Sequence, residues 1–212
     1  MLTAIVDYNS GNLHSAAKAF ERMASEKGAG QVVVTSDADQ VAVADRVVLP
    51  GDGAFPACKA ELMERSGLFE AIEEAVCRRA VPFFGICIGM QMMARVGHET
   101  TPTPGFGWLD GEVVPIAPDN ARLKVPHMGW NDLKIAQDHA VTAGLSTGDH
   151  VYFVHSYHMD LADRSQLIAD VDYGQPVTAI AGRDNMIGTQ FHPEKSQSTG
   201  LRLIGNFFDW RP

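Results

Sequence analysis

The chain has 212 residues, of which 45% are hydrophobic and 20% charged, a composition typical of a globular protein with a full hydrophobic core. The formal net charge of −9 argues against non-specific nucleic-acid binding, which depends on a basic surface. No stretch has the length of a membrane span, and the apolar run at the start is too short for a signal peptide. We therefore expect a cytoplasmic protein, a single domain over residues 1–212, that binds neither nucleic acid nor a membrane.

The first half alternates short apolar runs with helical patterns. Strands are predicted at 2–8, 31–36, 46–50 and 81–86, and helices at 12–28, 55–65 and 68–79. Gly28 is expected to close the first helix. Strands that are apolar throughout and separated by helices indicate a parallel sheet with helices on both faces.

The second half lacks helices between its predicted strands. These are expected at 111–117, 131–136, 150–158, 165–173, 177–185 and 186–193, with turns such as "GRDN", and a last helix runs over 198–209. The segment 124–131, "KVPHMGWN", has the profile of a shaped loop or contact surface. The fold class is therefore α/β, with a parallel core extended by a mixed or antiparallel section.

The stretch "GICIG" sets Cys87 between two glycines at the end of an apolar strand. It matches the G-x-nucleophile-x-G turn, in which small neighbours leave room for a sharp strand-to-helix bend. The start of the following helix favours the thiolate, the reactive form of the thiol. A buried cysteine that merely fills the core fits the motif alone equally well. Cys58 and Cys77 lie in helical patterns without flanking glycines and are expected to be ordinary core or surface thiols.

A cysteine nucleophile needs a base, normally a histidine distant in sequence. His192 in "TQFHPE" is the strongest candidate, because it follows an apolar strand and Pro193 favours an extended conformation. Residues two apart in an extended segment face the same side, so Glu194 can orient His192. The other histidines have weaker claims: His155 is expected to be a half-buried structural residue. No histidine or cysteine pair has a metal-binding spacing, so we expect neither a metal nor another cofactor.

A thiolate that attacks a carbonyl also requires donors for the developing oxyanion. The segment "VVLPGDGAF" supplies glycines directly after a buried strand, at the end of the sheet where parallel α/β proteins bind ligands. Asp52, between Gly51 and Gly53, would otherwise simply cap the next helix. The three segments together favour a catalytic site over separate structural explanations.

The ordered set "PGDGAF", "GICIGMQ" and "FHPE" resembles the class I, triad-type glutamine amidotransferases over nearly the whole chain. Further segments, "DYNSGNLHS", "KVPHMGWN", "YFVHSYH" and "FHPEKSQSTGLRLIGNF", are similar to the glutaminase subunits of imidazole glycerol phosphate synthases in histidine biosynthesis. The anthranilate, GMP and carbamoyl phosphate amidotransferases share the cysteine turn but not "KVPHMGWN". The resemblance implies a flavodoxin-like open sheet and release of ammonia from L-glutamine through a cysteinyl thioester.

The resemblance also implies residue roles. Cys87 would be the nucleophile, His192 the general base and acid, and Glu194 the residue that orients it. The oxyanion would lie among Gly51, Gly53 and the amide of Ile88. The glutamine substrate would be held by Gln91, Glu99, Ser156 and Tyr157. A (β/α)8-barrel cyclase, the partner in a heterodimer, would contact Asn12, Trp130, Tyr152 and Lys195.

Three positions depart from the family pattern. Asp52 stands where valine is usual, Ile88 replaces leucine, and Asn9 replaces a common glycine. Asp52 lies in the loop whose peptide must orient a donor, so it bears on the resting conformation of that loop. Two other hypotheses stay open: a peptidase or gamma-glutamyl hydrolase on the same scaffold, and a degenerate amidotransferase that only regulates a partner.

Overall fold

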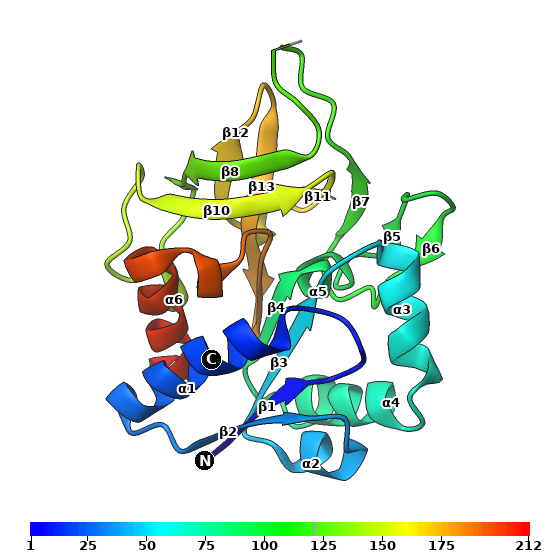
Figure 1. The fold of residues 1–212 in the computed structure, drawn as a ribbon, viewed down its shortest axis with the longest axis vertical. Coiled ribbons are helices and arrows are strands. Elements are labelled where there is room, and N and C mark those ends of the chain that lie inside the picture. Colours follow the sequence, from blue (N-terminus) through cyan, green and yellow to red (C-terminus); the bar gives the residue numbers. More distant parts are fainter. Residues whose placement is uncertain (121) are drawn as a thin grey trace.

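The computed structural model describes residues 1–120 and 122–212 and is built around one large sheet (Figure 1). In spatial order its strands are β2 (Gln31–Thr35), β1 (Leu2–Val6), β3 (Arg46–Gly51), β4 (Phe83–Cys87), β14 (Met186–Thr189), β13 (Pro176–Arg183), β12 (Leu167–Asp172) and β9 (Lys134–Ile135). The strands from β2 to β14 are parallel, and β13, β12 and β9 continue the sheet antiparallel. The order β2-β1-β3-β4-β14 is that of flavodoxin-like sheets, so the predicted fold class is confirmed.

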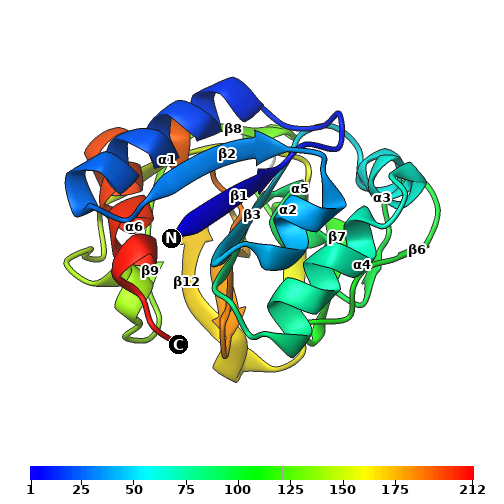
Figure 2. The same ribbon diagram turned by 90° about the horizontal axis from the view of Figure 1, so that it is seen from below.

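Helices cover both faces of this sheet (Figure 2). On one face lie α1 (Leu13–Lys27) and α6 (Gln197–Asp209), and on the other lie α2 (Ala38–Val43), α4 (Leu68–Glu73) and the π-helical turn η1 (Glu74–Arg78), with α3 (Phe55–Glu64) beside α4. Phe20 of α1 packs edge-on against Phe84 of β4 and Phe207 of α6. These contacts bury the apolar stripe of each helix against the sheet, which is the main source of helix stability in a globular protein.

The ends of α1 follow from single residues. The side chain of Asn12 accepts a hydrogen bond from the amide of Ser15 and caps the first turn. Gly28 adopts the left-handed conformation and closes the last turn, as its position in the sequence predicts. The strong local signals at both ends explain why the predicted bounds of this helix are correct to one residue.

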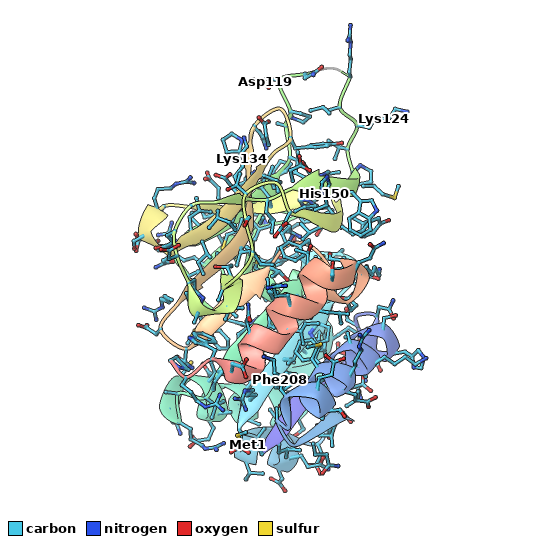
Figure 3. All side chains as sticks on the ribbon, turned by 90° about the vertical axis from the view of Figure 1, so that its left-hand side faces the viewer. Met1, Asp119, Lys124, Lys134, His150 and Phe208 are labelled. Atoms are coloured by element: carbon cyan, nitrogen blue, oxygen red, sulfur yellow. The ribbon has the colours of Figure 1, made fainter. Side chains whose placement is uncertain are left out.

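Two smaller sheets lie above the carboxyl ends of the parallel strands. One pairs β8 (His127–Asp132) with β10 (His150–His155), and the other has the order β11 (Tyr157–Leu161), β7 (Gly111–Pro115), β5 (Val96–Gly97), β6 (Thr103–Pro104). The remaining elements are α5 (Ile88–Gln91) and the 3-10 turns η2 (Ala140–Thr142), η3 (Arg164–Gln166) and η4 (Pro193–Lys195). Asp119 and Lys124 lie at the end of the molecule opposite Met1 (Figure 3).

Several expectations about elements were wrong, and the strand predicted over 131–136 is divided between β8 and β9. The single strand predicted over 150–158 is broken at Ser156, and its halves belong to different sheets. Most of the segment 124–131, predicted as a shaped loop or contact surface, is not a loop but strand β8, because its backbone pairs along β10. The helix predicted over 68–79 changes to π-helical geometry after Glu73, and the short helix α2 was not predicted. The break at Ser156 and the formation of β8 both follow from pairing with other strands. The periodicity of the sequence does not indicate this pairing.

The predicted turn "GRDN" joins β13 to β14 in an antiparallel hairpin, with Arg183 opposite Met186. Asp184 takes the left-handed conformation, with φ 48°, that such turns require. None of the helices formed within residues 1–120 and 122–212 is long and apolar enough to cross a bilayer.

Candidate active site

Cys87 is the last residue of β4 and stands at a sharp turn into α5. Its backbone angles, φ 55° and ψ −109°, lie where residues with a side chain are rarely found. Strain of this kind is concentrated at functional sites, because only a closely packed surrounding structure maintains it. The geometry is that of a strand–turn–helix nucleophile turn, as the motif predicts.

The two glycines that flank Cys87 are required by close packing of α5 on the sheet. A Cβ atom on Gly89 would lie 1.8 Å from the carbonyl oxygen of Leu49 in β3, and one on Gly85 would lie 2.7 Å from the carbonyl carbon of Gly89. Both distances are shorter than any contact a real Cβ makes. The glycines therefore let the helix descend onto β3 and β4 and hold the turn at Cys87.

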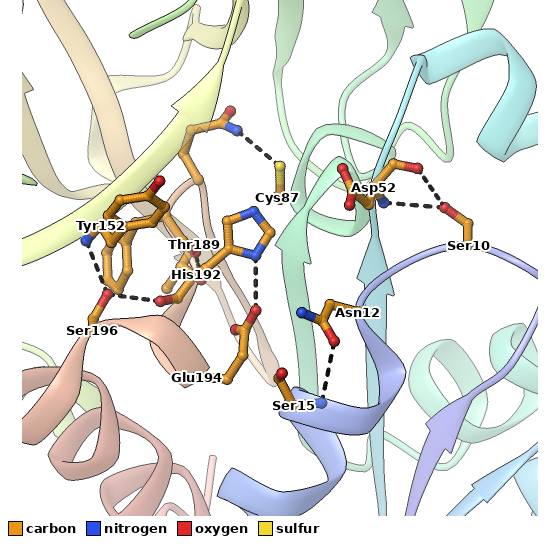
Figure 4. A network of polar contacts seen from close by, with 12 residues as sticks. Ser10, Asn12, Ser15, Asp52, Cys87, Tyr152, Thr189, His192, Glu194 and Ser196 are labelled. Atoms are coloured by element: carbon orange, nitrogen blue, oxygen red, sulfur yellow. Dashed lines mark hydrogen bonds and ion pairs between the residues drawn. The ribbon is translucent and has the colours of Figure 1, made fainter. Parts of the chain in front are cut away.

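His192 and Glu194 form a buried pair directly after β14. The Nδ1 atom of His192 lies 2.9 Å from Oε1 of Glu194, and their side chains are 3% and 2% exposed. Figure 4 shows the imidazole between the Glu194 carboxylate and the Cys87 sulfur. Among the described atoms, Nε2 of His192 has no hydrogen-bond partner, which leaves it available to the thiol. The three predicted catalytic residues thus lie together, in the order that proton transfer from the thiol requires.

Opposing effects set the pKa of His192. Burial, the largest of them, lowers this pKa, because it penalises the charged imidazolium. Interactions with the Cys87 sulfur and the Glu194 carboxylate together outweigh burial and raise the pKa to about 10. His192 is therefore suited to hold the proton that it takes from the thiol.

A cavity of about 250 Å³ opens above the sulfur at the carboxyl end of the sheet. It is lined by Asp52, Gly53, Cys87, Ile88, Gln91, Glu99, Pro126, Val154, His155, Ser156 and Tyr157. All four residues predicted to bind the substrate are in this set. The volume is below the range of about 300–1,000 Å³ usual for drug-sized ligands and suits a smaller molecule. A larger hollow, of about 700 Å³, lies between Asp119 and Lys134, and none of the described residues that line it is a cysteine, serine or histidine.

Gln91 is held by two hydrogen bonds at the wall of this cavity. Its Nε2 donates to the backbone oxygen of Tyr157 and to Oε1 of Gln190, each over 3.0 Å. Its own Oε1 is buried and has no partner among the described atoms. Gln190 in turn approaches the Cys87 sulfur with its Nε2 at 3.6 Å. Sequence reasoning missed Gln190, although its position two residues before His192 in an extended segment is a signal for it.

Glu99 also lines the cavity, and its carboxylate is already engaged. The Oε2 atom accepts a hydrogen bond of 2.7 Å from the amide of Phe55, the first residue of α3. A carboxylate at a helix N-terminus is stabilised by the helix dipole. Glu99 therefore presents a fixed negative charge to the cavity.

The loop predicted to hold the oxyanion lies beside Cys87. Gly51 pairs with Cys87 across β3 and β4, and a Cβ atom on it would lie 2.7 Å from the Cβ of Ile88. Gly53 has φ 111°, a conformation that favours glycine. Ile88 is the first residue of α5, so its amide has no acceptor within that helix. The three predicted oxyanion positions thus surround the nucleophile.

The peptide groups of Asp52 are tied to Ser10, away from the sulfur (Figure 4). The amide of Asp52 donates to Oγ of Ser10 over 3.1 Å, and its carbonyl accepts from that hydroxyl over 2.8 Å and from Cys58 over 3.4 Å. The Cys58 sulfur also lies 3.0 Å from the Ser10 hydroxyl. Cys58 is buried, as expected of a core thiol, but it also anchors this loop. In this conformation the Asp52 amide is not available to an oxyanion.

The residues predicted to contact a partner lie on β8 and β10, in η4 and at the start of α1. Trp130 is 47% exposed and meets Tyr152 edge to face, with ring centroids 5.8 Å apart. Lys195 belongs to η4, next to the His192–Glu194 pair, and Asn12 caps α1. Met128, 64% exposed, projects from β8 on the same side as Trp130 and extends the apolar patch. Exposed apolar patches of this kind often mark protein interfaces.

The described residues 1–120 and 122–212 contain no group of three or more His, Cys, Asp or Glu side chains arranged to bind a metal ion. The arrangement that is present, a strained cysteine beside a buried His–Glu pair on a flavodoxin-like sheet, is that of an enzyme that transfers acyl groups through a cysteine. Comparison with known proteins shows which family within this class of enzymes the chain belongs to.

The family described as glutamine amidotransferase class-I matches residues 5–210, and the chain belongs to this family. It is 65% identical to the imidazole glycerol phosphate synthase subunit HisH of Ruegeria pomeroyi and 66% identical to that of Cereibacter sphaeroides, with all of both chains covered. The HisH subunit of Mesorhizobium japonicum is 51% identical, again over both whole chains. The predicted family, and the predicted similarity to these subunits, are confirmed.

Solved structures show the same fold at low sequence identity. One glutamine amidotransferase superposes with a TM-score of 0.73 at 17% identity, covering 97% of each chain. Another, from Thermotoga maritima, gives 0.60 at 16% identity, covering 92% of this chain and 76% of the other. This likeness concerns the fold alone.

Replacing Gly89 with alanine tests the packing of the nucleophile turn. We expect Gly89→Ala to lower the free energy of unfolding by about 2 kcal/mol or more, because its Cβ would overlap backbone atoms of Leu49. Urea denaturation monitored by fluorescence measures this. Gly205→Ala in α6 is the control: its Cβ would meet only the flexible ends of Met23 and Lys27, so we expect it to be neutral or stabilising by about 0.5–1 kcal/mol. Equal stabilities for the two variants would contradict the packing argument.

Replacing Glu194 with glutamine tests the charge on His192. The raised pKa favours the folded state below pH 6.5, and this contribution is lost as the pH rises from 6.5 to about 10. In Glu194→Gln we expect the pKa of His192 to fall by roughly one to three pH units, so unfolding becomes less sensitive to pH in this window. Histidine NMR titration and urea denaturation at pH 7 and 9.5 measure the two effects. A wild-type His192 that titrates near pH 6.5 would refute the assignment.

Proposed function

We propose that this chain is the glutaminase subunit of an imidazole glycerol phosphate synthase in histidine biosynthesis, releasing ammonia from L-glutamine. The observation that carries the proposal is the strained Cys87 beside the His192–Glu194 pair, in a cavity of the size of an amino acid. The full-length similarity to HisH subunits supports the choice of this system. The single hydrophobic core supports one domain over residues 1–212, and we expect it in the cytoplasm.

The substrate fits the polarity of the cavity. Glu99 presents a carboxylate that can pair with the ammonium group of glutamine. Gln91 offers a buried side-chain oxygen without a partner among the described atoms, a second acceptor for that group. Ser156 and Tyr157, at the break between β10 and β11, also line the cavity and offer peptide groups. These contacts would place the side-chain amide of glutamine above the Cys87 sulfur.

The reaction then proceeds through a thioester. Nε2 of His192 takes the proton from Cys87, and the thiolate attacks the amide carbon of the substrate side chain. The imidazolium, stabilised by Glu194, gives the proton to the departing nitrogen, and ammonia leaves. Water, deprotonated by His192, attacks the thioester, and the bond to sulfur breaks to give glutamate and the free thiol.

The resting loop explains why such a subunit depends on a partner. The Ile88 amide is one donor for the oxyanion, but the Asp52 amide is bonded to Ser10. A second donor requires rotation of a peptide in the loop Gly51–Gly53, where glycine on both sides of Asp52 permits it. We propose that the partner favours the rotated loop, so ammonia is formed mainly when an acceptor is ready.

The partner we propose is a (β/α)8-barrel cyclase, bound as a heterodimer at the surface containing Asn12, Trp130, Tyr152 and Lys195. Ammonia must avoid protonation by water, so direct transfer across the interface is favoured. The cyclase would join it to a phosphoribulosyl formimino precursor to give imidazole glycerol phosphate and an aminoimidazole carboxamide ribotide. The two chains together then complete the reaction.

The nucleophile is tested by glutamate release from wild type and Cys87→Ala, each alone and with the cyclase and its acceptor. We expect the variant to release no glutamate under any condition, because no thioester can form. Wild type should be active on glutamine and stimulated by the liganded cyclase. Release by the variant would exclude Cys87 as nucleophile, and wild-type activity on gamma-glutamyl chains or peptides but not glutamine would favour the alternative hydrolases.

The loop is tested by Ser10→Ala, which removes the acceptor that holds the Asp52 amide. We expect glutamate release without the cyclase to rise by about three- to tenfold, the effect of one or two lost hydrogen bonds. Activity with the liganded cyclase should change less, because the loop is then already rotated. Ser25→Ala, at an exposed serine of α1, is the control. Unchanged or lower activity of Ser10→Ala without the cyclase would contradict the role of Ser10.

A further inference from the structure

Two buried histidines lie behind the cavity, outside the His192–Glu194 pair. His127 of β8 and His155 of β10 face each other across the two strands, with Nδ1 of His127 2.9 Å from Nε2 of His155. They are 2% and 6% exposed, and His155 also lines the cavity. Nδ1 of His155 lies 2.8 Å from the backbone oxygen of Tyr157. His127, His155 and the Tyr157 carbonyl are thus joined into one chain of hydrogen bonds.

Which atom donates in each of these hydrogen bonds is fixed by the groups at the two ends of the series. The Tyr157 carbonyl can only accept, so Nδ1 of His155 carries a proton and donates to it. At the other end, Oδ1 of Asn131 accepts from the amide of Asp132, so its Nδ2 faces Nε2 of His127 at 3.3 Å as a donor. Both requirements are met only when each neutral imidazole carries its proton on Nδ1.

The environment keeps both rings neutral and in place. Burial lowers the pKa of His127 to about 4 and that of His155 to about 3. The ring of His127 is stacked between Phe153 and Tyr173, with centroid distances of 4.6 and 3.9 Å. The Tyr173 hydroxyl is itself fixed by a 2.7 Å bond to the backbone oxygen of Lys124. The chain of hydrogen bonds therefore has one proton arrangement and little freedom to rotate.

The chain ends at the atom that orients Gln91. The Tyr157 oxygen accepts from His155 and, over 3.0 Å, from Nε2 of Gln91. Because this amide nitrogen is engaged there, Oε1 of Gln91 is the atom left without a partner at the cavity, among the atoms that the structure describes. The positions of the protons on the side chains of Asn131, His127 and His155 thus help to decide that Gln91 presents its oxygen, and not its nitrogen, to the cavity.

We propose that Asn131, His127 and His155 are positioning residues for substrate binding: they fix the Tyr157 carbonyl, and through it Gln91, in the orientation that accepts the ammonium group of glutamine. The assignment of the ligand rests on the proposed function. Strand β8 would then have two roles, since its outward residues Met128 and Trp130 form the apolar patch and its inward residues support the cavity.

The proton arrangement is tested first in the wild-type protein, because this needs neither activity nor a variant. Nitrogen-15 NMR of the labelled histidines distinguishes the two neutral tautomers and the imidazolium. We expect His127 and His155 both to be neutral at pH 7 with the proton on Nδ1. In Asn131→Asp, a nearly isosteric change, Nε2 of His127 would face an acceptor and should become protonated. A wild-type proton on Nε2 of either ring would overturn the proposal.

Kinetics of glutamine hydrolysis, in the complex with the liganded cyclase, test the effect on binding. We expect His155→Leu to raise KM about tenfold with kcat within about twofold, because the Tyr157 carbonyl loses one of its two donors and Gln91 is held less firmly. His155→Asn places an amide nitrogen near the position of Nδ1, so its KM should stay within about threefold of wild type. The matched control is His158→Asn, a buried histidine of β11 that contacts Gln175 and does not line the cavity.

The outcomes separate this proposal from the proposed function. Equal KM values for His155→Leu and His155→Asn, or a rise in KM as large for His158→Asn, would overturn the positioning role. Failure of His155→Leu to fold leaves the wild-type NMR result and His155→Asn to decide. A wild-type complex without glutaminase activity would refute the proposed function, whereas the tautomers of His127 and His155 would still be measurable.

Discussion

Parallel pairing between β4 and β14 is the constraint on which the site depends. Ile86 lies opposite Thr189 in this pair, so both strands end at the same edge of the sheet. Cys87 is the last residue of the one strand and His192 lies shortly after the end of the other, although more than a hundred residues separate them in sequence. Because the pairing is continuous with the buried core, the distance between thiol and imidazole is set by the sheet. Both side chains are thus held by buried strands of the sheet.

The same packing forces the strained conformation of Cys87. Helix α5 lies so close to β3 that only glycine fits at position 89, and the chain reaches it by a turn of positive φ. The free-energy cost of this strained conformation of Cys87 is offset by the many buried contacts of β3 and β4. The result is a nucleophile displayed at the start of a helix, with the Ile88 amide beside it.

Three buried histidines around the cavity show how environment assigns protonation. His127 and His155 have no carboxylate partner among the described residues, so burial keeps both neutral. His192 is also buried, but Glu194 and the Cys87 sulfur stabilise its charged form. A proton that leaves the thiol therefore resides on His192 and not on the neighbouring rings. Separate roles in catalysis and in positioning follow from these different surroundings.

The direction of the Asp52 peptide groups cannot be predicted from the neighbouring residues in the sequence. Its neighbours Gly51 and Gly53 indicate a flexible loop, and the sequence predicts a place for an oxyanion there. The direction of its amide, however, is decided by Ser10, and that of its carbonyl by Ser10 and Cys58; these contacts form only in the folded state. The same holds for Gln190, whose contact with the Cys87 sulfur depends on the approach of β14 to β4.

The sequence by itself determined the parallel core, the bounds of α1 and the identity of the candidate triad, because these depend on local periodicity, capping and short motifs. Only the tertiary structure decided that the run from His150 to His158 breaks at Ser156, and that His127 meets His155 behind the cavity. Both depend on which strands pair across a sheet. That choice minimises the free energy of the whole molecule, and no short window of sequence contains it.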